Sequence, residues 1–326
     1  MKKNPRLHLI LMLAAAAIAG SGPSAAAEDT GKAWKASQPI RIVVPFSAGG
    51  GSDVAARLLA QGLGNSLGEP VIVENKPGAS GAIASDLVYT AAPDGYTLLL
   101  GTADTQAMNP HVNKVRYDSL KYVPVAAIAK VSYVLVGRPD MPAADTKALV
   151  ALAKEKSLTY GSSGTGAAAD IQMRMFDDAA KIPNMLHVPY QGVAPAFQAL
   201  VAGQVDLAMI PVALVAQYRN KVKFYGIASM QRNPAIPDVP TLAEQGFPVD
   251  GDPWVGLLAP PKTPDAVANA IAERVAKVLA VPENQKKLRE VGMTPYQGTR
   301  SEFTEFYRKD YDKWEKAIKS AGITAQ

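Results

Sequence analysis

Short apolar runs alternate with helix-spaced segments along the first part of the chain. Residues 40–44, 71–73 and 96–100 are apolar runs of strand length. Residues 53–67 and 83–91 carry apolar side chains at the three-to-four-residue spacing of an amphipathic helix. This βαβαβ order predicts a parallel sheet that is covered by helices.

The alternation continues beyond residue 132 and predicts a second α/β unit. Its expected strands are 133–136, 159–161, 186–188, 206–210 and 224–228, and its expected helices are 145–156, 168–180 and 195–202. A further strand, 254–259, precedes predicted helices at 264–280, 282–291 and 301–321, which we expect to pack on the first sheet. The pattern therefore predicts two lobes joined by crossings near Ser132 and Asp252, with no internal repeat and no flexible linker.

The first 27 residues have the pattern of an export signal. Lys2, Lys3 and Arg6 precede an apolar run, and a small-residue stretch ends at Ala27 before Glu28. The run is about a dozen residues long, against the ~20 that span a bilayer, so a cleaved signal peptide is favoured over an uncleaved membrane anchor. We expect cleavage near Ala27 and a soluble protein in the periplasm.

Composition narrows the class of protein. With 48% hydrophobic and 19% charged residues the chain is able to bury a core, which argues against intrinsic disorder. The absence of cysteine excludes disulfides, thiolate metal sites and cysteine nucleophiles. Removing residues 1–27 lowers the formal net charge from +5 to +2, and no lysine or arginine cluster remains, so we expect no nucleic-acid partner.

Glycine-rich segments follow the predicted strands, where open α/β sheets bind ligands. Residues 45–53 (PFSAGGGSD), 75–81 (NKPGASG) and 161–166 (GSSGTG) offer backbone N–H groups near helix starts, which favour an anion. We expect Gly50 to need the positive φ that glycine permits. The structural alternative is that these are tight connections, with Ser52 as the helix N-cap and Asp53 as a cap and dipole partner.

Enzyme motifs are poorly matched. His111 and His187 lack metal-ligand spacing, and we expect His187 to be a packed, hydrogen-bonded ring. Neither G-x-S-x-G nor a P-loop is present. The strongest enzymatic alternative is a dinucleotide-binding fold with Glu74 after the second strand, but the turn has G-x-G-x-x-V, with Asp53 where pyrophosphate would lie. We expect no catalytic residue, no metal and no cofactor.

Several segments together resemble the Bug family, the periplasmic solute receptors of tripartite tricarboxylate transporters. They are PIRIVVPFSAGGGSD (39–53), VIVENKPGASGAIA (71–84), PDGYTLLLGT (93–102), YGSSGTG (160–166), HVPYQG with PAFQALVAGQVDL (187–207), PDVPTLAEQGFP (237–248) and WVGLLAPPKTP (254–264). The resemblance covers nearly the whole chain after the export signal. It implies a two-lobed periplasmic binding protein of type II (Venus flytrap), with a ligand cleft between lobes joined by two crossing strands.

The resemblance also implies a binding site for a small carboxylate. In the first lobe it implies Phe46, Ser47, Gly49, Gly50, Ser52 and Asp53, with Gly78, Ser80 and Thr102, and with Asn109 bordering the cleft. In the second lobe it implies Ser162, Ser163, Thr165, Gly166, Pro189 and Tyr190. Ile210 departs from the family's Met-Phe-Asp continuation, and we expect it to favour a less polar or aromatic ligand, with core packing as the alternative.

The expected organisation is a signal peptide (1–27), a first domain (28–132 with 253–326) and a second domain (133–252). We expect a monomer that captures a mono-, di- or tricarboxylate without catalysis and delivers it to two membrane subunits. The alternatives are a periplasmic carboxylate sensor that presents ligand to a signalling receptor, and a secreted α/β hydrolase or oxidoreductase.

Overall fold

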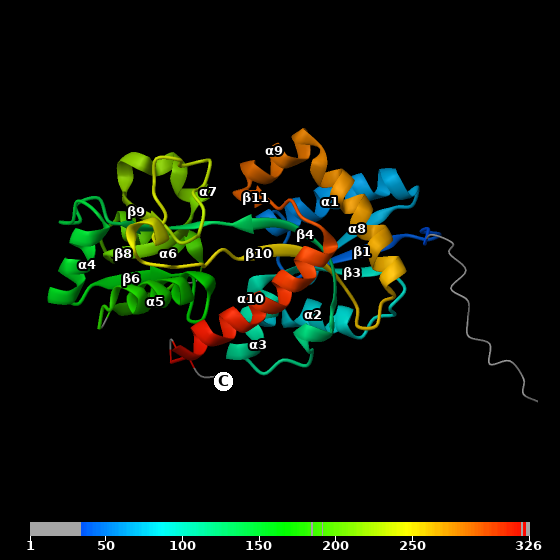
Figure 1. Cartoon of the computed structure of the whole chain (residues 1–326), viewed down its shortest axis with the longest axis horizontal. Coiled ribbons are helices and arrows are strands. Elements are labelled where there is room, and N and C mark those ends of the chain that lie inside the picture. The colour runs from blue at the N-terminus through cyan, green and yellow to red at the C-terminus, as the bar shows by residue number, and fades with distance from the viewer. Residues whose placement is uncertain (1–33, 184, 191, 321, 324–326) are drawn as a thin grey trace, which may run out of the picture. The chain divides into compact units, whose positions relative to one another are not determined.

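Two mixed β-sheets, each with helices on both faces, make up the described part of the chain (Figure 1). The computed structural model describes residues 34–183, 185–190, 192–320 and 322–323. The predicted signal peptide and its cleavage site lie outside these residues. Within them, no helix combines the length and the apolar character that crossing a membrane would require.

The first sheet has six strands in the order β11-β4-β10-β3-β1-β2. These are β1 (Ile40–Val44), β2 (Val71–Asn75), β3 (Thr97–Thr102), β4 (Val123–Val131), β10 (Trp254–Ala259) and β11 (Met293–Pro295). The prediction of a parallel sheet is right for β1, β2 and β3. The rest of the sheet, for which the pattern predicts no direction, is antiparallel: β10 runs antiparallel to β3 and β4, and β11 antiparallel to β4.

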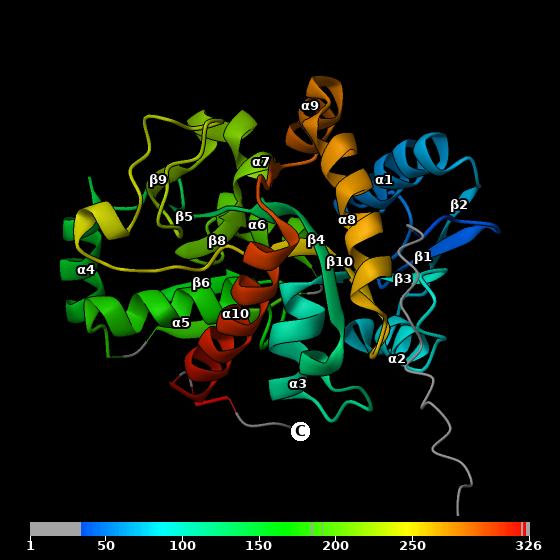
Figure 2. The ribbon, with the colours of Figure 1, turned by 45° about the vertical axis from the view of Figure 1, so that its right-hand side comes forward.

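Alternate residues of the first sheet face two cores, which is why its strands are apolar on both sides. Ile40, Ile42 and Val44 pack with helices α1 and α8, whereas Val43 and Leu99 face α2 and α10. The three C-terminal helices therefore belong with this sheet, as predicted (Figure 2). The helices and helical turns are α1 (Gly51–Leu67), η1 (Ala79–Gly81), α2 (Ala82–Tyr89), η2 (Asp104–Met108), α3 (Asn109–Val112), η3 (Ser119–Lys121), α8 (Asp265–Ala280), α9 (Pro282–Glu290) and α10 (Arg300–Ser320).

The second sheet has five strands in the order β7-β6-β8-β5-β9. They are β5 (Tyr133–Gly137), β6 (Thr159–Ser162), β7 (Leu186–Pro189), β8 (Leu207–Pro211) and β9 (Lys223–Ile227). Leu135 and Met209 face α4 and α5, while Val134 and Ala208 face α6 and α7. The helices and turns are α4 (Thr146–Glu155), α5 (Ala168–Ala180), α6 (Val193–Val201), α7 (Val212–Val215), η4 (Ala216–Lys221) and η5 (Ala243–Gln245).

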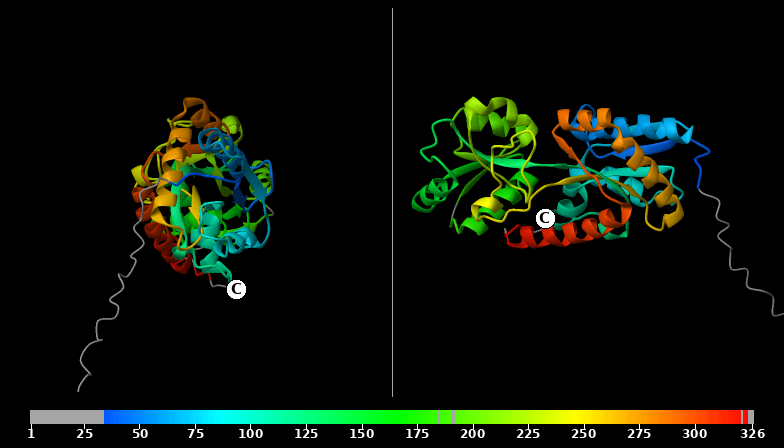
Figure 3. Two further views of the ribbon diagram at one scale, coloured as in Figure 1. Left: turned by 90° about the vertical axis from the view of Figure 1, so that its right-hand side faces the viewer. Right: turned by 45° about the horizontal axis from the view of Figure 1, so that its top comes forward.

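The chain passes between the sheets where the sequence predicted it. Ser132 is the single residue between β4 and β5, and Asp252 shortly precedes β10, which pairs with β4. Figure 3 shows the two extended segments that run between the sheets. At this crossing the Ser229 hydroxyl donates a hydrogen bond of 2.6 Å to the buried Asp252 carboxylate. Burial raises the pKa of Asp252 to about 6.

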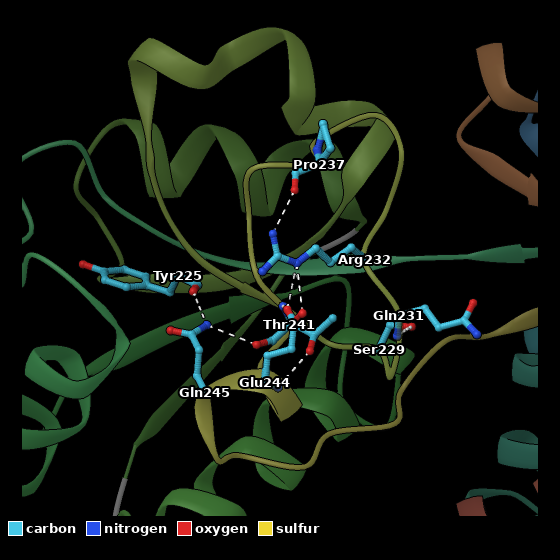
Figure 4. A network of polar contacts seen from close by, with 8 residues as sticks. All are labelled: Tyr225, Ser229, Gln231, Arg232, Pro237, Thr241, Glu244 and Gln245. Atoms are coloured by element: carbon cyan, nitrogen blue, oxygen red, sulfur yellow. Dashed lines mark hydrogen bonds and ion pairs between the residues drawn. The ribbon is translucent and has the colours of Figure 1, made fainter.

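The segment that returns from β9 to the crossing is tied down by side chains (Figure 4). Thr241 and Glu244 cap the turn η5 reciprocally: Glu244 Oε2 accepts from the Thr241 N–H at 2.7 Å, and Thr241 Oγ1 accepts from the Glu244 N–H at 2.9 Å. Arg232 pairs with Glu244 and donates to the Pro237 carbonyl, and Gln245 donates to the Tyr225 carbonyl. The motif PDVPTLAEQGFP therefore has a structural role here.

Candidate functional site

The first loop (residues 45–50) joins β1 to α1 in the first lobe. Pro45 is buried and Phe46 packs against the core, whereas residues 47–50 are exposed. The φ of Gly49 is +89°, but Gly50, the N-cap of α1, has φ −80°. The prediction that Gly50 needs a positive φ is therefore wrong, and Gly49 is the residue that needs it. Ser52 lies within the first turn of α1, so its assignment as N-cap is wrong too.

Asp53 holds this loop in shape. Its Oδ2 accepts from the Gly49 N–H at 3.0 Å and from Arg57 Nε at 2.9 Å. Its Oδ1 accepts from Asn75 Nδ2 at 3.0 Å, and the same amide group donates to the Phe46 carbonyl at 3.0 Å. The Arg57 hydrogen bond lowers the pKa of Asp53 to about 2, against the opposing effect of burial. Asp53 and Asn75 together thus hold the backbone of the first loop. The sequence indicates Asn75 only by its position at the end of β2.

The second loop (residues 76–81) follows β2 and is strained. Gly78 has φ +124°, and Ala79 and Ser80 have φ of 46° and 51°. A left-handed conformation costs a residue other than glycine about 1–2 kcal/mol, and such strain is concentrated at functional sites. The Asn109 side chain donates to the Ser80 carbonyl at 3.2 Å and holds the loop from the neighbouring helix α3. Gly78 and Ser80 are exposed, as a ligand contact requires.

Thr102, predicted to contact ligand, is buried at the end of β3. Its hydroxyl lies in a turn with Thr105, whose N–H donates to Thr102 Oγ1 at 3.3 Å. Two residues after Thr102, burial raises the pKa of Asp104, and the backbone N–H of Ala168, the first residue of α5 in the other lobe, acts in the opposite direction. Asp104 was missed because no sequence pattern indicates which residues of the other lobe lie near it.

The third loop (residues 163–167) joins β6 to α5 in the second lobe. Gly164 and Gly166 have φ of +135° and +74°, and Thr165 is exposed. The Gly166 N–H donates to Asp170 Oδ2 at 2.9 Å, and Arg174 Nε donates to Asp170 Oδ1 at 2.9 Å. A Cβ on Gly166 would lie 3.4 Å from Val112 of the first lobe. This loop therefore lies beside α3.

The first and third loops share one arrangement. In each, a glycine with positive φ donates its N–H to an aspartate four residues later, and that aspartate pairs with an arginine four residues later again. Gly49, Asp53 and Arg57 match Gly166, Asp170 and Arg174 at identical spacing. The two lobes therefore carry the same short G-x3-D-x3-R spacing, which the sequence analysis did not single out.

Ser162 lies beneath the third loop, and its side chain is buried, with 1% of the residue exposed. Its Oγ lies 2.7 Å from His187 Nε2, while His187 Nδ1 lies 3.7 Å from Asp170 Oδ1. The three side chains stand in the order of a serine protease triad, but the serine is covered and the histidine–aspartate distance exceeds a hydrogen bond. His187 is a packed, hydrogen-bonded ring, as predicted.

Of the other residues predicted in the second lobe, Pro189 and Tyr190 lie near the cluster of Ser162, His187 and Asp170, whereas Ile210 does not. Pro189 ends β7 and is exposed, and the Tyr190 N–H donates to the Ser162 carbonyl at 2.9 Å. Ile210 is only 1% exposed, packs in a core cluster and pairs with Val134. The expectation that Ile210 shapes the ligand pocket is wrong, because its position in β8 directs it into the core. Among the described residues, no group of three His, Cys, Asp or Glu side chains is placed to hold a metal ion.

Comparison with known proteins agrees with this fold and loop arrangement. Residues 55–323 match the model of the family described as "Tripartite tricarboxylate transporter family receptor". The chain belongs to this receptor family. It is 35% identical to a UPF0065 protein of Bordetella pertussis over 299 residues, which cover 89% of this chain and 91% of the relative. Family members are periplasmic solute-binding receptors, and the family is not an enzymatic one.

Solved structures share the fold. The periplasmic binding protein BugD is 32% identical, with a TM-score of 0.72 over 89% of this chain and all of that one. Rpa4515 of R. palustris, solved with adipate, has a TM-score of 0.76 at 29% identity over 89% and 99% of the two chains. MatC of Rhodopseudomonas palustris, solved with bound malate, has a TM-score of 0.71 at 29% identity over 86% and 99%. These neighbours confirm the α/β, two-lobed fold class and the resemblance to the Bug family.

Proposed function

We propose that this protein binds a small organic carboxylate between its two lobes, through the first, second and third loops, and delivers it to the two membrane subunits of a tripartite tricarboxylate transporter. The observation that carries the proposal is the paired arrangement of the first and third loops. Each of these loops places backbone N–H groups at the amino end of a long helix, α1 or α5. The helix dipole and these N–H groups attract an anion.

Arg57 and Arg174 neutralise two carboxylates that would otherwise repel an anionic ligand. A carboxylate in the first turn of a helix repels an anionic ligand, and both loops contain one, Asp53 and Asp170. Arg57 and Arg174 pair with these carboxylates at 2.9 Å and neutralise them. The loop amides are then left to attract a ligand carboxylate, and the adipate and malate bound by two structural neighbours are ligands of this chemistry.

Thermal unfolding with a panel of carboxylates that includes adipate and malate tests the proposal. A ligand at one hundred times its Kd stabilises the folded state by about 2.7 kcal/mol, which raises Tm by several degrees at roughly 2–4 °C per kcal/mol. The methyl ester of the same ligand lacks the charge and should give little shift. If no carboxylate shifts Tm, or if the ester binds as well as the acid, the proposed site chemistry is wrong.

A matched pair of variants locates the site. Gly49 and Gly68 both have positive φ with no atom within 4 Å of a Cβ, so valine strains the backbone similarly at either position. Gly49 lies in the first loop, whereas Gly68 caps the other end of α1. We expect Gly49→Val to abolish the shift and Gly68→Val to retain it. Consumption of the ligand during these assays would favour the enzyme alternative, and intact carboxylate uptake in cells that lack the protein would favour the sensor alternative.

A further inference from the structure

The cluster beneath the third loop consists of Ser162, His187 and Asp170. It contains a titratable group, the imidazole of His187, that the proposed function does not use. Ser162 Oγ contacts three groups: His187 Nε2 at 2.7 Å, the Gly164 carbonyl at 2.9 Å and the Gly164 N–H at 3.2 Å. Ser162 is thereby the side chain that fixes Gly164, as Asp170 is the side chain that fixes Gly166.

His187 lies between these two side chains. Its Nδ1 faces Asp170 Oδ1 at 3.7 Å, and its ring stacks on Tyr160 with centroids 4.8 Å apart. The Tyr160 hydroxyl donates to Asp170 Oδ1 at 2.6 Å. The imidazole therefore contacts Ser162 and Tyr160 and faces Asp170.

The Ser162 hydroxyl has a single proton, which cannot be donated to both the Gly164 carbonyl and His187 Nε2. A neutral imidazole with its proton on Nδ1, facing the Asp170 carboxylate, has a bare Nε2 that draws the Ser162 proton away from Gly164. A protonated imidazole donates from both nitrogens. It then leaves the Ser162 proton on the Gly164 carbonyl and the loop fully hydrogen-bonded.

The surrounding charges make the protonation state of His187 responsive to an anion. Burial lowers the pKa of His187 below its usual value, the Asp170 carboxylate acts in the opposite direction, and Arg174 lowers it further. A ligand carboxylate on the third loop adds a negative charge that favours the imidazolium.

We propose that His187 is a positioning residue of the ligand site and that carboxylate binding is coupled to proton uptake at its imidazole. This inference rests on the proposed function. By linkage, a ligand that favours the protonated histidine binds more tightly as the pH falls. Tyr160, Asp170 and Arg174 are the other titratable or charged side chains that bear on this equilibrium.

Calorimetric titration of the full chain with adipate, malate and the other members of the carboxylate panel tests the coupling. At pH 7 the binding heat should differ between phosphate and Tris buffers, with the sign that marks proton uptake. The Kd should rise about fivefold or more between pH 5.5 and 7.5, the lower end of typical coupling. His187→Gln, which keeps a hydrogen-bonding amide but does not titrate, should lose both effects.

His111→Gln is the matched control, because His111 is also a half-buried histidine with a pKa lowered by burial, but its ring lies against Tyr311, tilted by 55° with the centroids 4.5 Å apart. This variant should keep the buffer and pH effects. Should His187→Gln fail to fold, NMR titration of the parent imidazoles replaces it: ligand should raise the pKa of His187 and leave that of His111 unchanged. Binding without proton uptake, or with an unchanged His187 pKa, overturns the coupling and leaves the proposed function standing. Absence of any binding overturns both.

Discussion

The first and third loops use the same G-x3-D-x3-R arrangement in different surroundings. In the first loop Asp53 is 3% exposed, but its partner Arg57 extends into solvent with 56% of its side chain exposed. In the third loop Asp170 is fully buried, and the Tyr160 hydroxyl, the Arg174 guanidinium and the His187 ring surround it. The local hydrogen bonds are alike because the spacing is alike. The surroundings decide how much each aspartate contributes to stability and whether a titrating neighbour acts on it.

The largest difference should appear when each carboxylate is replaced by an amide. Asp170→Asn removes the buried negative charge that accepts from Arg174 Nε and turns an amide N–H group towards one of the donors that the carboxylate now accepts, such as the Gly166 N–H, which should lower the free energy of unfolding by about 3–5 kcal/mol. Asp53→Asn should cost about 1–2 kcal/mol, since the exposed Arg57 is rehydrated. Urea unfolding of both variants measures the comparison. Equal losses would show that burial does not distinguish the two loops.

Acid should remove the contribution of Asp53 to the free energy of unfolding within a defined pH range. The pKa of Asp53 is about 2 in the folded chain and 3.8 when unperturbed, so its contribution is complete above about pH 4 and is lost as the pH falls towards 2. The full contribution is about 2 kcal/mol. Stability measured from pH 5 to 2 should fall less steeply in Asp53→Asn than in the parent chain. Parallel curves would mean that Asp53 is not held ionised by Arg57.

Alanine at the loop glycines should give the smallest effects. Gly49→Ala and Gly166→Ala place a Cβ on a left-handed residue and should each cost about 1–2 kcal/mol. Gly50→Ala should change stability by less than about 0.5 kcal/mol, because its φ of −80° suits any residue and its nearest neighbour to a Cβ is 3.9 Å away. A large loss in Gly50→Ala would contradict this backbone assignment.

The apolar periodicity determined most of the secondary structure. The strands β1 and β10 and the helix α5 begin and end where the pattern predicts, because their residues are buried on a regular period. The strand β4 was missed, since Pro124 and its alanines give it little strand propensity. It forms because β10 and β11 pair on its two sides. Such pairing between strands far apart in the sequence is a property of the tertiary structure, and the local pattern does not predict it.

The family, the two crossings and the glycine-rich loops could be predicted from the sequence, because motif letters and hydrophobic spacing are local properties of the chain. The partners of the loop side chains could not. His187 reaches Ser162 across 25 positions only because β7 pairs with β6, and Gly166 lies beside Val112 only because the two lobes meet there. Ile210 likewise turned into the core through its pairing with β5. Strand pairing and burial fix which polar atoms meet, and no linear pattern records them.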